Sequence, residues 1–128
     1  MKKIIKNGKV YDGISDKIKQ QDVLITDGVI TDVGNIDISD GDIEIIDASN
    51  YIVSPGFIDI HSHLREPGYE YKETIATGTR AASKGGFTTI CAMPTTIPAL
   101  DSKDSIDYFK DLCKQRSIIK VHPIGAVT

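Results

Sequence analysis

The chain has 128 residues, of which 40% are hydrophobic and 26% charged, and its 15 basic and 18 acidic side chains give a formal net charge of -3 at pH 7. This length suffices for one ordinary domain but not for most two-domain enzymes. The charges are interspersed, and no basic block or apolar run of membrane-spanning length occurs. The composition therefore indicates neither a nucleic-acid partner nor a membrane.

Residues 1–54 contain short apolar runs separated by turn signals. Asn7-Gly8 and Asp27-Gly28 are dipeptides that accept the positive φ values of a two-residue hairpin turn, so each predicts a hairpin. The runs expected to form strands are 4–6, 9–11, 23–26, 29–33, 43–47 and 51–53. This part of the chain is predicted to be a small all-β unit.

From residue 55 the pattern changes to alternating strands and helices. Strands are predicted over 57–61, 87–92 and 118–122, and helices over 71–84 and from Asp101 or Ser102 to about Gln115. Gly85-Gly86 is a natural C-terminal stop for the first helix. Strand, helix, strand, helix, strand is typical of an α/β fold with a parallel sheet. Three strands cannot close a barrel, and residues 125–128 add no terminating helix, so we expect a fragment.

Cys91 and Cys113 are isolated cysteines in unlike surroundings, one in an apolar strand-like run and one in a helix-like segment. There is no CxxC spacing that would suggest a cysteine metal site. The two residues are predicted to be reduced core thiols of a cytoplasmic protein. The opening segment has only two apolar residues before its third lysine, which is unlike a secretory signal.

His61 and His63 are the most informative pair in the sequence. Strand alternation would place Asp59, His61 and His63, with Arg65, on one face, and such a polar face is costly to bury unless it binds something. A divalent metal is the obvious ligand, although spacing alone leaves a structural histidine pair equally open. The pair follows an apolar strand and precedes a Pro-Gly loop, where parallel α/β barrels build active sites. A catalytic zinc needs a third protein ligand, and none is evident here.

The neighbours of this pair each have a functional and a structural interpretation. Asp59 is either a second-shell group that orients a ligand or a solvated carboxylate. Arg65 offers a planar fork for a substrate carboxylate, or it pairs with nearby acids. Those acids, with Lys72, are expected to form the solvated start of the helix; they are Glu66, Glu70 and Glu73.

The Pro-rich loop 93–100 follows the second strand of the α/β part and would line the same pocket. The hydroxyls of Thr95 and Thr96 can donate to a ligand there, but threonine in such a turn more often caps its own backbone. The backbone interpretation is favoured for Thr96. His122 is interpreted as structural because its strand lacks the other features of the site.

The segment 54–101, with PGFIDIHSHLREPGYEYKETIATGTRAASKGGFTTICAMP, closely resembles the class I dihydroorotases of the amidohydrolase superfamily. The runs DVLITDGVITDVG and IIDASNYIVSPGF resemble that superfamily's N-terminal β-sandwich. The resemblance implies a zinc-dependent hydrolase that interconverts (S)-dihydroorotate and N-carbamoyl-L-aspartate in de novo pyrimidine biosynthesis. It also implies that residues 1–54 belong to a composite β-sandwich and residues 55–128 to the start of a (β/α)8 TIM barrel.

By position, His61 and His63 match the first two zinc ligands, and the substrate-binding positions are His63, Arg65 and Thr95. The family usually has Asn where this chain has Thr95, which puts that substrate contact in question. The remaining ligands, of one or two zinc ions, and the general base would lie beyond position 128. No catalytic residue is therefore expected in this chain, which should be inactive alone. A homodimer or a complex with aspartate transcarbamoylase is the partner that the resemblance suggests.

Two other readings stay open. Allantoinases and hydantoinases resemble this chain in the histidine motif and in the glycine pair followed by threonines. Neither usually carries HLREPG with YKETIATGT behind it, which favours dihydroorotase. The second reading is a non-catalytic, dihydroorotase-like structural partner of aspartate transcarbamoylase, and it is motivated by Thr95.

Overall fold

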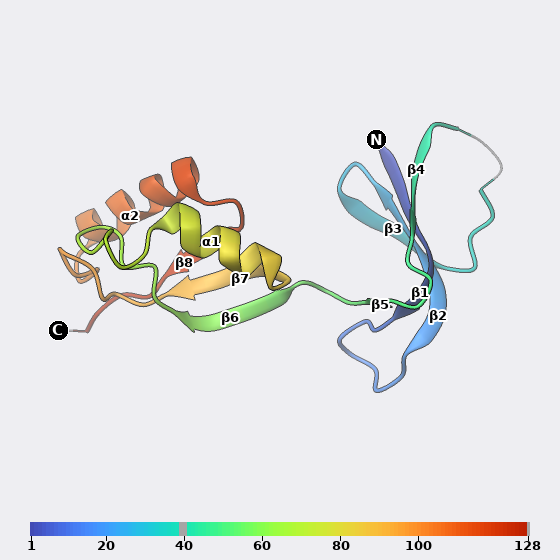
Figure 1. The fold of residues 1–128 in the computed structure, drawn as a ribbon, viewed down its shortest axis with the longest axis horizontal. Coiled ribbons are helices and arrows are strands. Elements are labelled where there is room, and N and C mark those ends of the chain that lie inside the picture. Colours follow the sequence, from blue (N-terminus) through green and yellow to red (C-terminus); the bar gives the residue numbers. More distant parts are fainter. Residues whose placement is uncertain (39–40, 128) are drawn as a thin grey trace. The chain divides into compact units, whose positions relative to one another are not determined.

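The computed structural model describes residues 1–38 and 41–127 and divides the chain into two compact units, 1–55 and 56–128 (Figure 1). Residue 128, where the predicted barrel segment ends, lies outside the described residues. In the described part of the chain, none of the helices combines the length and the apolar character needed to cross a membrane. Cys91 and Cys113 are both free thiols, as predicted; Cys113 is buried in the core, whereas Cys91 is only partly buried.

The first unit is a five-stranded sheet. Its strands are β1 (Lys2–Val10), β2 (Lys19–Thr26), β3 (Val29–Gly34), β4 (Ile43–Asp47) and β5 (Ile52–Val53), with the order β3-β2-β1-β4 and β5 paired with β1. The hairpin predicted at Asp27-Gly28 is confirmed, because φ is 51° at Asp27 and 81° at Gly28 and these two residues join β2 to β3. Ile4 and Val23, from neighbouring strands, are buried in this unit.

The hairpin predicted at Asn7-Gly8 is wrong. β1 runs through both residues as one strand, and its register with β2 shifts between Ile5 and Gly8. Asn7 does adopt a positive φ of 63°, but it uses that conformation in a β-bulge instead of a turn. The Asp22 carboxylate holds the bulge because Oδ1 accepts from the Asn7 backbone N–H at 2.9 Å and Oδ2 accepts from Lys6 Nζ at 2.8 Å.

The second unit alternates strands and helices as the sequence predicts. It consists of β6 (Phe57–Ser62), α1 (Ile75–Lys84), β7 (Phe87–Ala92), α2 (Lys103–Arg116) and β8 (Lys120–Pro123). The three strands form a parallel sheet in the order β6-β7-β8. Figure 1 shows both helices over one face of this sheet. The fold class of this unit is therefore α/β.

The core of the second unit lies between the sheet and the helices. It is formed by residues from both strands and helices, namely Leu64, Ile75, Ile90, Ala92, Leu100, Phe109, Leu112 and Cys113. Phe109 and Ile75 are fully buried, so the apolar spacing of each helix faces the sheet. On β6, by contrast, Ile58 and Ile60 are 63% and 75% exposed.

Capping groups fix where the helices begin. Ser102 is the N-cap of α2, one of the two residues that the sequence proposed. α1 begins at Ile75, four residues later than predicted, because the Thr74 side chain caps it and accepts from the Thr77 N–H. Gly85 and Gly86 follow the end of α1, and Gly86 has a φ of 84°.

Candidate metal and substrate site

The candidate site lies where β6 and β7 end. The Met93 N–H donates to the carbonyl of Ser62 at 2.8 Å, and Ser62 Oγ donates to the carbonyl of Cys91 at 3.1 Å. These bonds hold the segment after β6 beside the segment after β7. The carboxyl ends of parallel strands are the edge at which open and closed α/β folds place their ligands.

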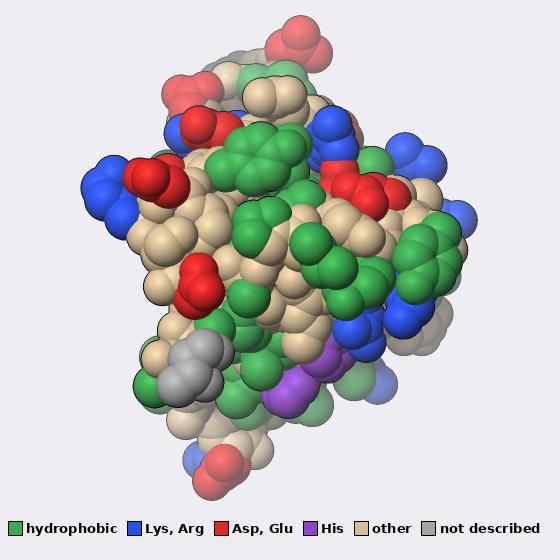
Figure 2. Space-filling view, turned by 90° about the vertical axis from the view of Figure 1, so that its left-hand side faces the viewer, with side chains coloured by type: hydrophobic (Ala, Val, Ile, Leu, Met, Phe, Trp, Pro, Cys, Tyr) green, Lys and Arg blue, Asp and Glu red, His purple; other side chains and the backbone are tan. Residues whose placement is uncertain are grey.

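His61 and His63 come together at this edge. Their ring centroids lie 5.3 Å apart, with an angle of 62° between the ring planes, and both side chains are exposed. In Figure 2, histidine side chains lie at the surface beside an apolar area. The register of β6 against β7 shifts between Asp59 and Ser62, and β6 ends at Ser62, so the pair straddles the end of the strand. The structure brings the two imidazoles together as the sequence predicts.

The His63 ring is held by the loop that follows β7. Its Nδ1 lies 2.8 Å from Thr95 Oγ1, and no described residue hydrogen-bonds its Nε2. Desolvation by neighbouring atoms, followed by the positive charges of Arg65 and His61, lowers the pKa of His63 below the ordinary 6.5. A lower pKa favours the neutral imidazole, which is the form that binds metal ions.

Asp59 and Arg65 flank the pair. Asp59 Oδ1 accepts a hydrogen bond of 3.0 Å from the backbone N–H of His61, so the contact is with the backbone and not with the imidazole. Arg65 has a φ of 63° and is partly buried. No described acidic side chain forms an ion pair with it. It stays a prediction that Asp59 orients a metal ligand and that Arg65 binds the substrate carboxylate.

Glu66 is the residue that the sequence interpretation placed wrongly. It was expected in the solvated start of the helix, but it is only 1% exposed. Its Oε2 accepts from the Ile75 N–H at 2.7 Å, and its Oε1 is in contact with Arg116 Nη1. Nothing in the local charge pattern reveals this burial, since the partners are 9 and 50 residues away in sequence.

The two threonines of the loop 93–100 differ in burial and in hydrogen bonding. Thr96 is buried, and its hydroxyl donates to the carbonyl of Pro98 at 2.7 Å, which confirms the backbone interpretation. Thr95 is exposed and contacts His63 as described above. Of the two hydroxyls, only that of Thr95 therefore belongs to the candidate site.

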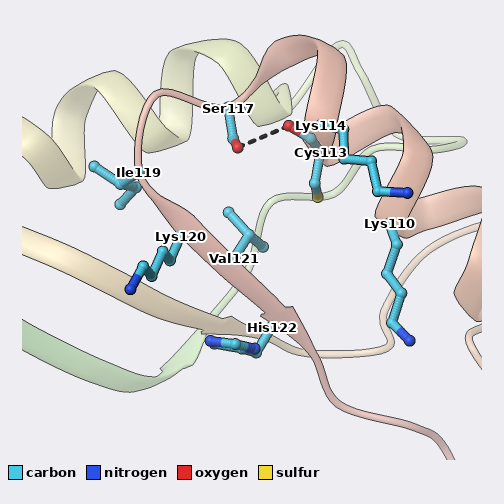
Figure 3. A pocket seen from close by; sticks show the side chains of 8 residues that line it. All are labelled: Lys110, Cys113, Lys114, Ser117, Ile119, Lys120, Val121 and His122. Atoms are coloured by element: carbon cyan, nitrogen blue, oxygen red, sulfur yellow. Dashed lines mark hydrogen bonds between the residues drawn. The ribbon is translucent and has the colours of Figure 1, made fainter.

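His122 is one of the residues that line a hollow of about 270 Å³ beside α2 and β8 (Figure 3). Figure 3 shows Val121 directed toward α2 and its Cys113, whereas His122 points away from that helix. The hollow also has lysines from α2 and β8 around it, which are Lys110, Lys114 and Lys120. Among residues 1–38 and 41–127, no three His, Cys, Asp or Glu side chains are grouped so that they could hold a metal ion.

The fold of this chain is also found in solved hydantoinases. The L-hydantoinase (dihydropyrimidinase) from Arthrobacter aurescens matches with a TM-score of 0.86 and 29% identity, over 96% of this chain and 27% of that one. The fold of the chain is thus that of part of a cyclic amide hydrolase.

Sequence comparison narrows this class to one family. Residues 50–128 match the family described as Dihydro-orotase-like, and the chain belongs to that family. The dihydroorotases of Caldanaerobacter subterraneus and Staphylococcus aureus are each 48% identical to it, over 100% and 98% of this chain. The chain spans 29% of the length of each of these two relatives.

Proposed function

We propose that this chain supplies the first part of the active site of a dihydroorotase, which interconverts (S)-dihydroorotate and N-carbamoyl-L-aspartate in pyrimidine synthesis. The observation that carries the proposal is the pairing of His61 and His63, with Thr95 on one ring nitrogen of His63. Identities of 48% to dihydroorotases, against 29% to the L-hydantoinase, favour the dihydroorotase reaction over the hydantoinase one.

Imidazole nitrogens fit zinc, and the donor set here provides two of the three protein ligands that a catalytic zinc ion requires. His61 and His63 would hold the ion, together with ligands from outside residues 1–128. One or two such ions would polarise the ring amide carbonyl and make water a stronger nucleophile. The hydrogen bond between Thr95 Oγ1 and Nδ1 of His63 leaves Nε2 available to the ion and fixes the orientation of the ring.

Arg65 is proposed to bind the substrate carboxylate. A guanidinium offers a planar pair of N–H donors that matches the two oxygens of a carboxylate. Arg65 is two residues from His63, and its left-handed backbone conformation turns the chain immediately after the histidine pair. The carboxylate would thus be fixed beside the scissile ring amide, which orients the ring for attack.

The proposal extends to the fold of the complete protein, to its partners and to its cellular compartment. β6, β7 and β8 would be the first three strands of a (β/α)8 barrel, with 1–54 as part of a β-sandwich. The enzyme would act in the cytoplasm, as a homodimer or together with aspartate transcarbamoylase. The chain alone would lack a general base and would be inactive.

The experiment is an assay of N-carbamoyl-L-aspartate formation by the complete protein that the gene encodes. His61→Ala and His63→Ala should each abolish the activity and the binding of zinc. His122→Ala is the matched control, because it removes a histidine from the hollow beside α2 and β8 and should leave both unchanged. Hydrolysis of hydantoin without hydrolysis of dihydroorotate would instead support the hydantoinase reading.

A further inference from the structure

Glu66 is a buried carboxylate with two partners from different helices. The Ile75 N–H belongs to the first residue of α1, and Arg116 is the last residue of α2. A carboxylate is costly to bury unless it is paired and hydrogen-bonded. Oε2 accepts a hydrogen bond from the N-terminus of α1, and Oε1, which has no hydrogen-bond partner among the described residues, is compensated by its ion pair with the Arg116 guanidinium.

The same residue is joined to the candidate site by a single peptide bond. Arg65 precedes it, and the loop after β6 folds tightly there, since the Glu66 N–H donates to the carbonyl of Leu64 at 2.7 Å. The Tyr69 N–H donates to the carbonyl of Arg65 at 3.1 Å. Arg65 itself is in the left-handed region, which is unfavourable for a side chain with a Cβ and persists only where the surroundings enforce it.

α1 does not need Glu66 for its main cap. The Thr74 hydroxyl already accepts from the Thr77 N–H and forms a capping box with that residue. Arg116, in turn, has a side chain that is 48% exposed and would be solvated without its partner. What the two contacts have in common is that each fixes the position of residue 66, and therefore of the loop segment that carries Arg65.

We propose that Glu66 is a positioning residue for Arg65: its carboxylate, held by the Ile75 N–H and Arg116, keeps the loop in the conformation in which Arg65 receives the substrate carboxylate. This inference rests on the proposed function. It assigns to Arg116, 51 residues from Arg65 in the sequence, a role in substrate binding without contact to the substrate. The role requires the charge of Glu66, because a neutral acceptor would satisfy Ile75 but would not bind the guanidinium strongly.

The test compares Glu66→Gln, Arg116→Gln and Lys114→Gln in the complete protein. Glu66→Gln keeps an acceptor oxygen for the Ile75 N–H and replaces the charged oxygen that faces Arg116 by an amide NH2 group, which cannot accept from the guanidinium. Lys114→Gln is the matched control, because Lys114 lies in the same last turn of α2 but pairs with exposed Asp111. We expect the KM for dihydroorotate to rise about tenfold in Glu66→Gln and in Arg116→Gln, with kcat within about twofold of the parent, and no change in Lys114→Gln.

An unchanged KM in Glu66→Gln, in a protein that hydrolyses dihydroorotate, would overturn the inference. A fall in kcat at constant KM, with a matching loss of thermal stability, would also overturn it, because it would show a purely structural role. If the parent protein does not hydrolyse dihydroorotate, the proposed function fails, and hydrogen exchange decides only whether Glu66 holds the loop that carries Arg65. Faster exchange of the Tyr69 amide in Glu66→Gln than in Lys114→Gln would then support it, and equal rates would refute it.

Discussion

Nδ1 of His63 and Oγ1 of Thr95 lie 2.8 Å apart, although 32 residues separate them in the sequence. The contact joins the segments that follow β6 and β7, and it fixes one of the two imidazoles of the candidate metal site. Outer partners of this kind set the orientation of a metal-bound histidine and raise its basicity.

The first prediction follows from this contact. In the complete protein, Thr95→Val should weaken zinc binding about 10-fold or more, because the ring of His63 loses the group that orients it. Zinc affinity is measured by competition with a chromophoric chelator. Thr95→Ser keeps a hydroxyl at the same position and should bind zinc like the parent; equal affinity in the valine variant would contradict the assignment.

Thr95→Asn addresses the substrate contact that the family resemblance implies. If Thr95 serves only His63, the asparagine variant should hydrolyse dihydroorotate with a KM at or below that of the parent, since the added amide can reach the substrate carboxylate. Steady-state kinetics of the two proteins decide this. A higher KM in Thr95→Asn would show that the threonine hydroxyl itself contributes to binding.

The 128-residue chain by itself should neither bind a stoichiometric zinc ion nor hydrolyse dihydroorotate. Two imidazoles are fewer than the three protein ligands of a catalytic zinc ion, and no described group of three suitable side chains exists. Equilibrium dialysis against zinc, followed by metal analysis, measures the first property. One equivalent of tightly bound zinc, with turnover, would refute the expectation.

Acid should weaken the first unit through Asp22, which is 8% exposed. Burial raises the pKa of Asp22, but hydrogen bonds from Lys6 and from the N–H groups of Asn7 and Ile36 outweigh it, so its folded-state pKa lies below the ordinary 3.8. The stabilisation is therefore complete above about pH 3.8 and is lost as the pH falls through the lower folded-state value.

Asp22→Asn should remove this part of the acid dependence and cost about 1–3 kcal/mol at neutral pH, because the Lys6 ammonium loses its charged partner. Urea unfolding between pH 2 and pH 7 measures both effects. The control is Asp16→Asn, which changes an exposed carboxylate of the same unit. An unaltered pH profile in the Asp22 variant would contradict the prediction.

Gly68 is expected to tolerate no side chain. Its φ is 100°, and a Cβ at this position would lie 2.5 Å from the Cβ of Ile97 and 2.8 Å from the Ile97 carbonyl oxygen. Gly68→Ala should therefore destabilise the protein by about 1–3 kcal/mol and separate the two loops of the site. Gly28→Ala is the control, since its φ of 81° is similarly unfavourable but nothing lies within 4 Å. Equal losses in thermal unfolding would show that backbone strain alone is responsible.

Burial raises the pKa of the Cys113 thiol to about 12. The native 128-residue chain should therefore present at most one reactive thiol to Ellman's reagent at pH 8, and both of its thiols after denaturation. Cys113→Ser should leave the native count unchanged. Rapid reaction of two thiols in the native parent would contradict the burial of Cys113.

Local signals predicted the elements better than their boundaries or their geometry. Asn7-Gly8 and Asp27-Gly28 carry the same hairpin signal, but both residues have a positive φ only in Asp27-Gly28, whereas in the first dipeptide only Asn7 does. Only Asp27-Gly28 forms a turn, because Asn7 instead meets the carboxylate of Asp22 in a bulge against β2. A dipeptide favours a backbone conformation, whereas the neighbouring strand determines whether that conformation forms a hairpin turn or a β-bulge.

The candidate site shows the same difference between what local sequence signals predict and what tertiary contacts determine. The sequence by itself determined the family, the alternation of strands and helices after residue 55, and the histidine pair, because these depend on residue type and short spacing. Only the tertiary structure decided that Thr95 meets His63 and that Glu66 is buried between Ile75 and Arg116. Those contacts join residues 9 to 50 positions apart, and parallel strands with helical crossovers bring such residues together in ways that no local pattern encodes.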